Sequence, residues 1–138
     1  MGADIKPDMD DVCRARRVLV VDDAALVRRY VRGALEFAGF EVDEAINGIE
    51  AMEKVLANRF DLLVVDINMP KMDGYKFLHT LRSGAPDISS IPALITSTEA
   101  TQQDALTGRA AGANFYLVKP ISQAQLVFYA SAMTGRSP

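Results

Sequence analysis

Two short apolar runs in this chain end in carboxylates. Val18–Val21 is followed at once by Asp22 and Asp23, and Leu62–Val65 is followed by Asp66. If the two runs are neighbouring parallel strands, the three acids meet at one edge of one sheet. Two like charges about 4 Å apart repel by roughly 4 kcal/mol at an effective dielectric constant of about 20, so such a cluster requires a cation. Each Asp alone could simply cap the following helix, but three acids after two strands favour a divalent-metal site.

The same carboxylates suit magnesium and phosphoryl chemistry. Mg²⁺ prefers octahedral oxygen ligation and usually takes about one or two carboxylates together with water and phosphate oxygens. Asp23 and Asp66 are candidates for direct ligation, Asp22 for ligation through water, and a backbone carbonyl after Asp66 for a further oxygen. A carboxylate can also be the nucleophile that forms an aspartyl-phosphate, and Asp66, at the end of the central strand, is the natural candidate.

A cation and a hydroxyl follow two later apolar runs. Lys119 comes after Phe115–Val118, where it would pair with a phosphoryl group as a point charge. Ser97 follows Ala93–Thr96, where its hydroxyl could donate a hydrogen bond to a phosphoryl oxygen. Taken alone, Lys119 could be a solvated surface charge, and Ser97 or Thr96 a polar residue entering a loop. Their common position at strand ends favours the functional interpretation.

Strand and helix patterns alternate five times along the chain. The pattern predicts strands at about 17–21, 41–44, 61–65, 93–96 and 115–118. It predicts helices from about 25 up to Gly39, at 49–57, after Gly74 up to a break at Ser83–Pro86, at about 101–111, and at 122–133 with Ser122 as N-cap. Strict alternation predicts an α/β fold with a parallel sheet, whose ligands bind at the carboxyl ends of the strands.

The composition indicates one ordinary globular domain. The 138 residues are 49% hydrophobic with a net charge of −3, which gives no electrostatic footprint for nucleic acid or for a membrane surface. The single cysteine, Cys13, cannot form an internal disulfide, and no apolar stretch approaches the length of a membrane span. The acidic start does not resemble a signal peptide. We therefore expect a cytoplasmic protein, with residues 1–15 as a flexible tail before one domain at 16–135.

Five motifs occur in an order and at separations that identify a family. They are Val-Asp-Asp at 21–23, Asp-Ile-Asn-Met-Pro at 66–70, Met-Asp-Gly at 72–74, Ser97, and Val-Lys-Pro at 118–120. With these motifs the chain resembles the response-regulator receiver domains of two-component signalling, in particular the single-domain chemotaxis-type regulators. The resemblance covers about 15–135. It implies a flavodoxin-like, doubly wound fold, a five-stranded parallel sheet in the order 2-1-3-4-5 with five helices.

The resemblance implies a role for each acid and for the lysine. Asp66 would accept a phosphoryl group from the phosphohistidine of a histidine kinase or of a histidine phosphotransfer protein. Asp22, Asp23 and Asp66 would hold Mg²⁺ together with the backbone oxygen of Asn68. Lys119 would contact the phosphoryl group.

The resemblance also implies switch and lifetime residues. Ser97 would move towards the phosphoryl group, and Tyr116 would rotate inward when Ser97 moves. Asn68 and Glu99 match the pair found in rapidly self-dephosphorylating chemotaxis regulators, which predicts a short-lived phosphoryl group. Lys119-Pro120 would be a cis bond.

The resemblance further implies how the signal leaves the protein. No output domain follows the fifth predicted helix, so we expect a downstream protein to bind the face made by the fourth helix, the fifth strand and the fifth helix. We expect no contact with nucleic acid or membrane. The chain could equally be a receiver excised from a longer regulator.

Three other functions compete with this interpretation. A flavin-binding electron carrier would need a phosphate-binding loop after the first strand, where the chain has Asp22-Asp23-Ala24-Ala25, which repels phosphate. A Mg²⁺-dependent small-molecule phosphatase would need a general acid two residues beyond Asp66, where Asn68 stands. A receiver that binds partners without phosphorylation would not need the complete set of acids.

Overall fold

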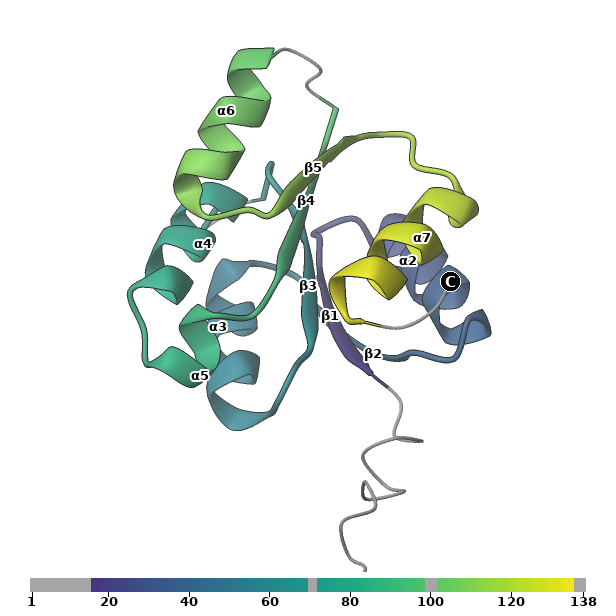
Figure 1. Cartoon of the computed structure of the whole chain (residues 1–138), viewed down its shortest axis with the longest axis horizontal. Helices are drawn as coiled ribbons and strands as arrows, with labels where there is room; N and C mark the ends of the chain where they lie inside the picture. Colours follow the sequence, from purple (N-terminus) through teal and green to yellow (C-terminus); the bar gives the residue numbers. More distant parts are fainter. Residues whose placement is uncertain (1–15, 70–71, 99–101, 136–138) are drawn as a thin grey trace, which may run out of the picture.

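The chain folds as a five-stranded parallel sheet covered by helices on both faces (Figure 1). The computed structural model describes residues 16–69, 72–98 and 102–135. The strands are β1 (Arg17–Val21), β2 (Glu41–Ala45), β3 (Leu62–Asp66), β4 (Ala93–Ser97) and β5 (Phe115–Val118), in the order β2-β1-β3-β4-β5. The helices are α2 (Ala25–Phe37), α3 (Gly48–Ala57), α4 (Gly74–Arg82), α5 (Pro86–Ser89), α6 (Gln102–Ala111) and α7 (Gln123–Met133). The flavodoxin-like, doubly wound α/β fold is therefore confirmed.

The described residues contain six helices, and the prediction of five was wrong. The additional helix, α5, is a single turn with Pro86 in its first turn and Ile88 buried. Proline is tolerated there because the N–H that it lacks would have no helical partner. The segment Ser83–Pro86 does end α4 as expected, but Pro86 also begins a new turn. The predicted bounds of all five strands lie within one residue of those observed.

The pleat of the strands divides the core into two layers. In β1, Leu19 and Val21 belong to the layer beneath α3, α4 and α5, whereas Val18 and Val20 belong to the layer beneath α2 and α7. All four side chains are at most 1% exposed, as expected for a central strand of a parallel sheet. Full burial of each such side chain contributes about 1.5–3 kcal/mol to folding. The sheet is thus a rigid platform with helices on either side.

Side-chain caps fix the segments that leave three of the strands. Asn47 Oδ1, after β2, accepts a hydrogen bond from the N–H of Glu50 at 2.8 Å. Asp73 Oδ1, after β3, accepts one from the N–H of Lys76 at 2.8 Å. Ser122, after β5, forms a capping box with Gln125, which confirms its prediction as an N-cap. At the carboxyl edge of the sheet, the caps therefore fix the start of the helix that follows each of these three strands.

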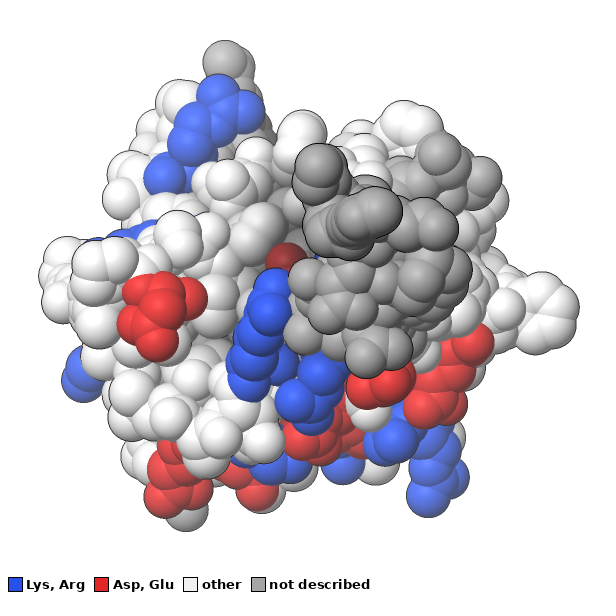
Figure 2. Space-filling view, turned by 60° about the horizontal axis from the view of Figure 1, so that its bottom comes forward, with Lys and Arg blue, Asp and Glu red and all other residues white. Residues whose placement is uncertain are grey.

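The face at the amino ends of the strands carries charges of both signs (Figure 2). Arg17 lies 3.8 Å from Glu41, and Arg59 lies 3.7 Å from Asp61. Such pairs near the surface contribute little to stability, and Figure 2 shows positive and negative side chains side by side along this face. Within the described ranges, no helix combines the length and apolar character that a bilayer crossing requires.

Arg82, the last residue of α4, binds two later segments of the chain: the end of α5 with the residues that follow it, and the loop between α6 and β5. Its guanidinium donates to the backbone carbonyls of Ser89 (2.9 Å), Ile91 (2.6 Å) and Gly112 (2.7 and 2.9 Å), and to the side-chain Oδ1 of Asn114 (3.2 Å). Burial lowers the pKa of Arg82, and among the described residues no carboxylate pairs with it. A planar guanidinium can make all of these bonds at once, which a lysine ammonium cannot.

We predict that Arg82→Ala lowers the free energy of unfolding by about 2–4 kcal/mol, because several partly buried carbonyl groups lose their donor. Arg82→Lys should recover less than half of this loss. Lys76→Ala, at an exposed position of the same helix, should change stability by less than about 0.5 kcal/mol. Urea unfolding of the three variants measures the difference, and equal stabilities for Arg82→Ala and Lys76→Ala would contradict the assignment.

Candidate functional site

The three predicted acids converge at the carboxyl edge of the sheet. Asp22 follows β1, Asp66 ends β3, and carboxylate oxygens of Asp22, Asp23 and Asp66 all lie within 4.8 Å of one another. Asp22 is 2% exposed and Asp66 5%, whereas Asp23 is exposed. Adjacent parallel strands β1 and β3 place these side chains together, as the sequence predicted. This donor set of hard oxygens fits Mg²⁺.

Lys119 links the two buried acids. Its Nζ lies 3.1 Å from Asp22 Oδ2 and 3.2 Å from Asp66 Oδ1, and its side chain is 21% exposed. Burial disfavours the ammonium, but the hydrogen bonds and charges of Asp22 and Asp66 outweigh burial and raise the pKa of Lys119. The Lys119-Pro120 bond is cis, as the resemblance implied. One ammonium faces three carboxylates, so the cluster keeps an excess of negative charge.

Asp66 is the acid whose ionisation the site opposes. Burial, and then the charge of Asp22, raise its pKa, while Lys119 and the backbone N–H of Asn68 act in the opposite direction. Asp22 is held separately, since its Oδ1 accepts a hydrogen bond from the N–H of Ala24 at 2.9 Å. A cation near Asp66 would offset both the cost of burying the charged carboxylate and the repulsion from Asp22.

The loop after Asp66 is held against two neighbouring elements. The N–H of Ile67 donates to the carbonyl of Thr96 in β4, and the N–H of Gly74 donates to the carbonyl of Ile67, both at 3.1 Å. A Cβ on Gly74 would lie 2.5 Å from the carbonyl oxygen of Asp66 and 2.9 Å from Ile67 Cα, so a side chain at this position would displace the backbone of Asp66. The close approach holds the backbone at Asp66 and Ile67 in place.

Ser97 and Thr96 lie on opposite faces of β4. Both are buried, and Asp66 pairs with Thr96 in the β3–β4 register. Ile95 belongs to the core layer beneath α3 and α4, and the period-two alternation of a strand puts Ser97 on that same face. The N–H of Lys119 donates to the carbonyl of Ser97 at 2.6 Å, which joins the ends of β4 and β5.

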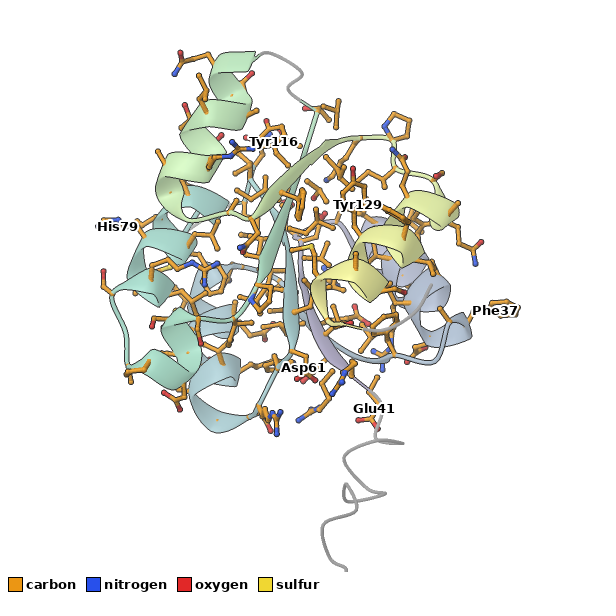
Figure 3. The ribbon with its side chains drawn as sticks, viewed as in Figure 1. Phe37, Glu41, Asp61, His79, Tyr116 and Tyr129 are labelled. Atoms are coloured by element: carbon orange, nitrogen blue, oxygen red, sulfur yellow. The ribbon has the colours of Figure 1, made fainter. Side chains whose placement is uncertain are left out.

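Tyr116 is half-buried on the α6 side of β5 (Figure 3). Its register partner is Ile95, so it shares a sheet face with Ser97. Its hydroxyl is hydrogen-bonded to that of Tyr75 in α4, and burial followed by the charge of Tyr116 raises the pKa of Tyr75. Sequence reasoning missed Tyr75, because a tyrosine in an amphipathic helix carries no signal beyond packing.

The remaining predicted site residues have different environments. Asn68 is exposed beside Asp66. Glu99 lies outside the described residues, so its pairing with Asn68 stays a prediction. The sequence also missed Arg28, whose side chain is only 15% exposed and lies 2.8 Å from Glu44. A partly buried ion pair between residues 16 positions apart, on two different elements, leaves no local pattern in the sequence.

We predict that Asp66→Asn raises the free energy of unfolding by about 1–2 kcal/mol at pH 7.5 without divalent metal. Because the folded state raises the pKa of Asp66, ionisation costs stability as pH rises from the unfolded value, about 3.9, through the folded one. The advantage of the variant should therefore be smallest near pH 4 and should grow towards neutrality.

Urea unfolding of both proteins between pH 4 and 8 measures this advantage. Asp87→Asn, at an exposed position, serves as the control and should show no such growth. An Asp66→Asn protein that is less stable than the wild type at pH 7.5 would contradict the electrostatic account.

Comparisons with known proteins agree with this geometry. The transcriptional regulatory protein PrrA of Mycobacterium bovis is 39% identical over 128 residues, which cover 93% of this chain and 54% of PrrA, and PrrA of Mycobacterium tuberculosis gives the same values. The chain thus spans about half the length of the curated relatives it matches.

Solved structures match over nearly their whole length. The chemotaxis protein CheY4 of Vibrio cholerae is 34% identical with a TM-score of 0.81, over 86% of this chain and 98% of CheY4. A putative response regulator from Chloroflexus aurantiacus is 31% identical with a TM-score of 0.84, over 89% and 100%. The family description "Response regulator receiver domain" matches residues 18–130. With its sheet, strand order and motifs, the chain belongs to the receiver-domain family of two-component response regulators.

Proposed function

We propose that this receiver domain, at about 16–135, is a phosphorylatable switch whose phosphoacceptor is Asp66. The observation that carries the proposal is the contact of Lys119 with both Asp22 and Asp66. This contact brings Asp66, the proposed nucleophile, together with a neighbouring acid and a cation in one largely buried cluster. The proposed donor is the phosphohistidine of a histidine kinase or of a histidine phosphotransfer protein.

The acids are proposed to hold Mg²⁺. Asp22, Asp23, Asp66 and the backbone oxygen of Asn68 would be its protein ligands, since carboxylate and carbonyl oxygens suit this ion. When bound, the ion supplies neutralisation of the phosphoryl charge and alignment of the phosphoryl oxygens. Lys119 offsets only part of the negative charge of the acids. The remaining negative charge would attract a dication, and the ammonium of Lys119 would attract a phosphoryl group.

The transfer itself needs no general acid from the chain. A carboxylate oxygen of Asp66 attacks phosphorus, the bond from phosphorus to the donor imidazole nitrogen breaks, and the nitrogen keeps the electron pair. The ammonium of Lys119 would contact the phosphoryl oxygens during the transfer and offset their negative charge. The Ser97 hydroxyl would donate a hydrogen bond to one of them, which would move the end of β4.

The readout is proposed to pass from β4 to β5. Ser97 and Tyr116 lie on one sheet face, and a shift of Ser97 is proposed to change the space available to the Tyr116 ring. Phosphorylation would then favour one of two conformations, and a partner that binds this conformation better would report the signal.

The proposed docking surface is the face formed by α6, β5 and α7, which corresponds to the fourth helix, fifth strand and fifth helix of the sequence prediction. It exposes apolar side chains at Leu106, Phe115, Val118 and Phe128. The Tyr129 ring lies 5.3 Å from that of Phe115 and 5.4 Å from that of Phe128. These apolar, aromatic side chains suit a protein partner.

Two alternatives to a free-standing phosphorylatable switch are a receiver within a longer regulator and a Mg²⁺-dependent phosphatase. The curated relatives are about twice as long and are named transcriptional regulatory proteins, so this receiver could act within a longer regulator. A Mg²⁺-dependent phosphatase is less well supported, because Asn68 stands where the general acid would be.

The direct test is the intact mass after incubation with acetyl phosphate and Mg²⁺. We predict a single phosphoryl adduct on the wild type, no adduct on Asp66→Ala, and strongly reduced phosphorylation of Lys119→Ala. Asp61→Ala, at an acid near the opposite edge of the sheet (Figure 3), should be phosphorylated as the wild type is. A wild-type protein that gains no adduct, or an Asp66→Ala protein that gains one, would overturn the assignment.

A further inference from the structure

The turn between β1 and α2 carries two of the three acids. It consists only of Asp22, Asp23 and Ala24. The N–H of Asp22 donates to the carbonyl of Ala45, at the end of β2, at 3.1 Å. Asp23 is exposed, and no donor among the described residues is hydrogen-bonded to its carboxylate. The position of the Asp23 carboxylate therefore follows from the backbone of the turn.

Arg28, in the first turn of α2, binds the backbone of Asp22 at its carbonyl group. Its Nη1 donates to the carbonyl oxygen of Asp22 at 2.8 Å, and its Nε donates to Glu44 Oε1, also at 2.8 Å. Glu44 precedes Ala45 in β2. The backbone of Asp22 is thus tied to the end of β2 twice, directly through its N–H and through Arg28 at its carbonyl.

Glu44 is itself fixed on both oxygens. Its Oε2 accepts a hydrogen bond from Nη1 of Arg32, one helical turn beyond Arg28, at 2.7 Å. The side chains of Arg28 and Glu44 are 15% and 24% exposed, so the pair is largely shielded from water. Such charge-assisted bonds in a planar fork are short and directional. Arg29, the next residue, is exposed.

We propose that Arg28 is a positioning residue for the metal site. Together with Glu44 it holds the β1–α2 turn so that the oxygens of Asp22 and Asp23 stay in the arrangement that binds Mg²⁺. The inference rests on the proposed function, because it assumes that the acids bind this ion. Metal ligands must be held within about 0.5 Å of their working geometry, and loss of a residue that orients them typically weakens affinity about 10–100-fold.

Calorimetric titration of the full chain with Mg²⁺, well below the melting temperature of each variant, tests the proposal. Arg28→Ala should weaken the dissociation constant for Mg²⁺ by about 10-fold or more. Arg28→Lys should not restore it, because one ammonium cannot hold both the Asp22 carbonyl and Glu44. Arg29→Ala is the matched control and should bind as the wild type does.

Several outcomes decide the matter. A lower melting temperature with unchanged Mg²⁺ affinity in Arg28→Ala would show a role in folding only and would overturn the proposal. An equal loss of affinity in Arg29→Ala would overturn it too. Should Arg28→Ala fail to fold, Glu44→Gln replaces it, with weaker Mg²⁺ binding expected and unchanged binding contradicting the proposal. A wild type that binds no Mg²⁺ would overturn the metal site itself, and this inference with it.

Discussion

One ammonium between two buried carboxylates is the interaction on which the site depends. Lys119 Nζ lies 3.1 Å from Asp22 and 3.2 Å from Asp66, which are 2% and 5% exposed. Buried charges are costly unless they are paired and hydrogen-bonded. Lys119 pairs with both acids, yet Asp23 adds a third carboxylate to the cluster. Burial and then the charge of Asp22 raise the pKa of Asp66, whereas the hydrogen bonds and charges of Asp22 and Asp66 outweigh burial and raise the pKa of Lys119. A site with this charge distribution favours a cation and, with the cation, a phosphoryl group.

The sheet makes this arrangement rigid. β1, β3 and β4 are buried strands whose register brings Asp22, Asp66 and Ser97 to one edge, and Lys119 follows β5 at the same edge. The loops that leave this edge are held by caps, by the close approach of Gly74 to Asp66, and by the pair of Arg28 and Glu44. We propose that phosphorylation causes a small movement of Ser97. Because the rest of the sheet is rigid, this movement would be transmitted to the docking surface formed by α6, β5 and α7.

Much of this could be predicted from the sequence, because strand ends and helix caps are local signals. The acids after two apolar runs, the Ser122 cap and the strand bounds to within one residue all depend on neighbouring residues. The α5 turn was missed because Pro86 both ends one pattern and begins another. The role of Arg28 was missed because its partner Glu44 lies 16 residues away, on a different element. The resemblance already assigned the switch to Ser97, but the sheet face on which its side chain lies follows only from the register of β4 with β5, in which Ile95 pairs with Tyr116.

The three carboxylates are proposed to form a site for a divalent cation. The most direct measurement is the free energy of unfolding in urea as Mg²⁺ is added at constant ionic strength. Binding to the folded state alone predicts a gain of about 2.7 kcal/mol when Mg²⁺ reaches about 100 times its dissociation constant. Asp23→Asn, which removes the exposed acid of the cluster, should lose most of this gain. A wild type that Mg²⁺ stabilises no more than an equal ionic strength of NaCl would contradict the account.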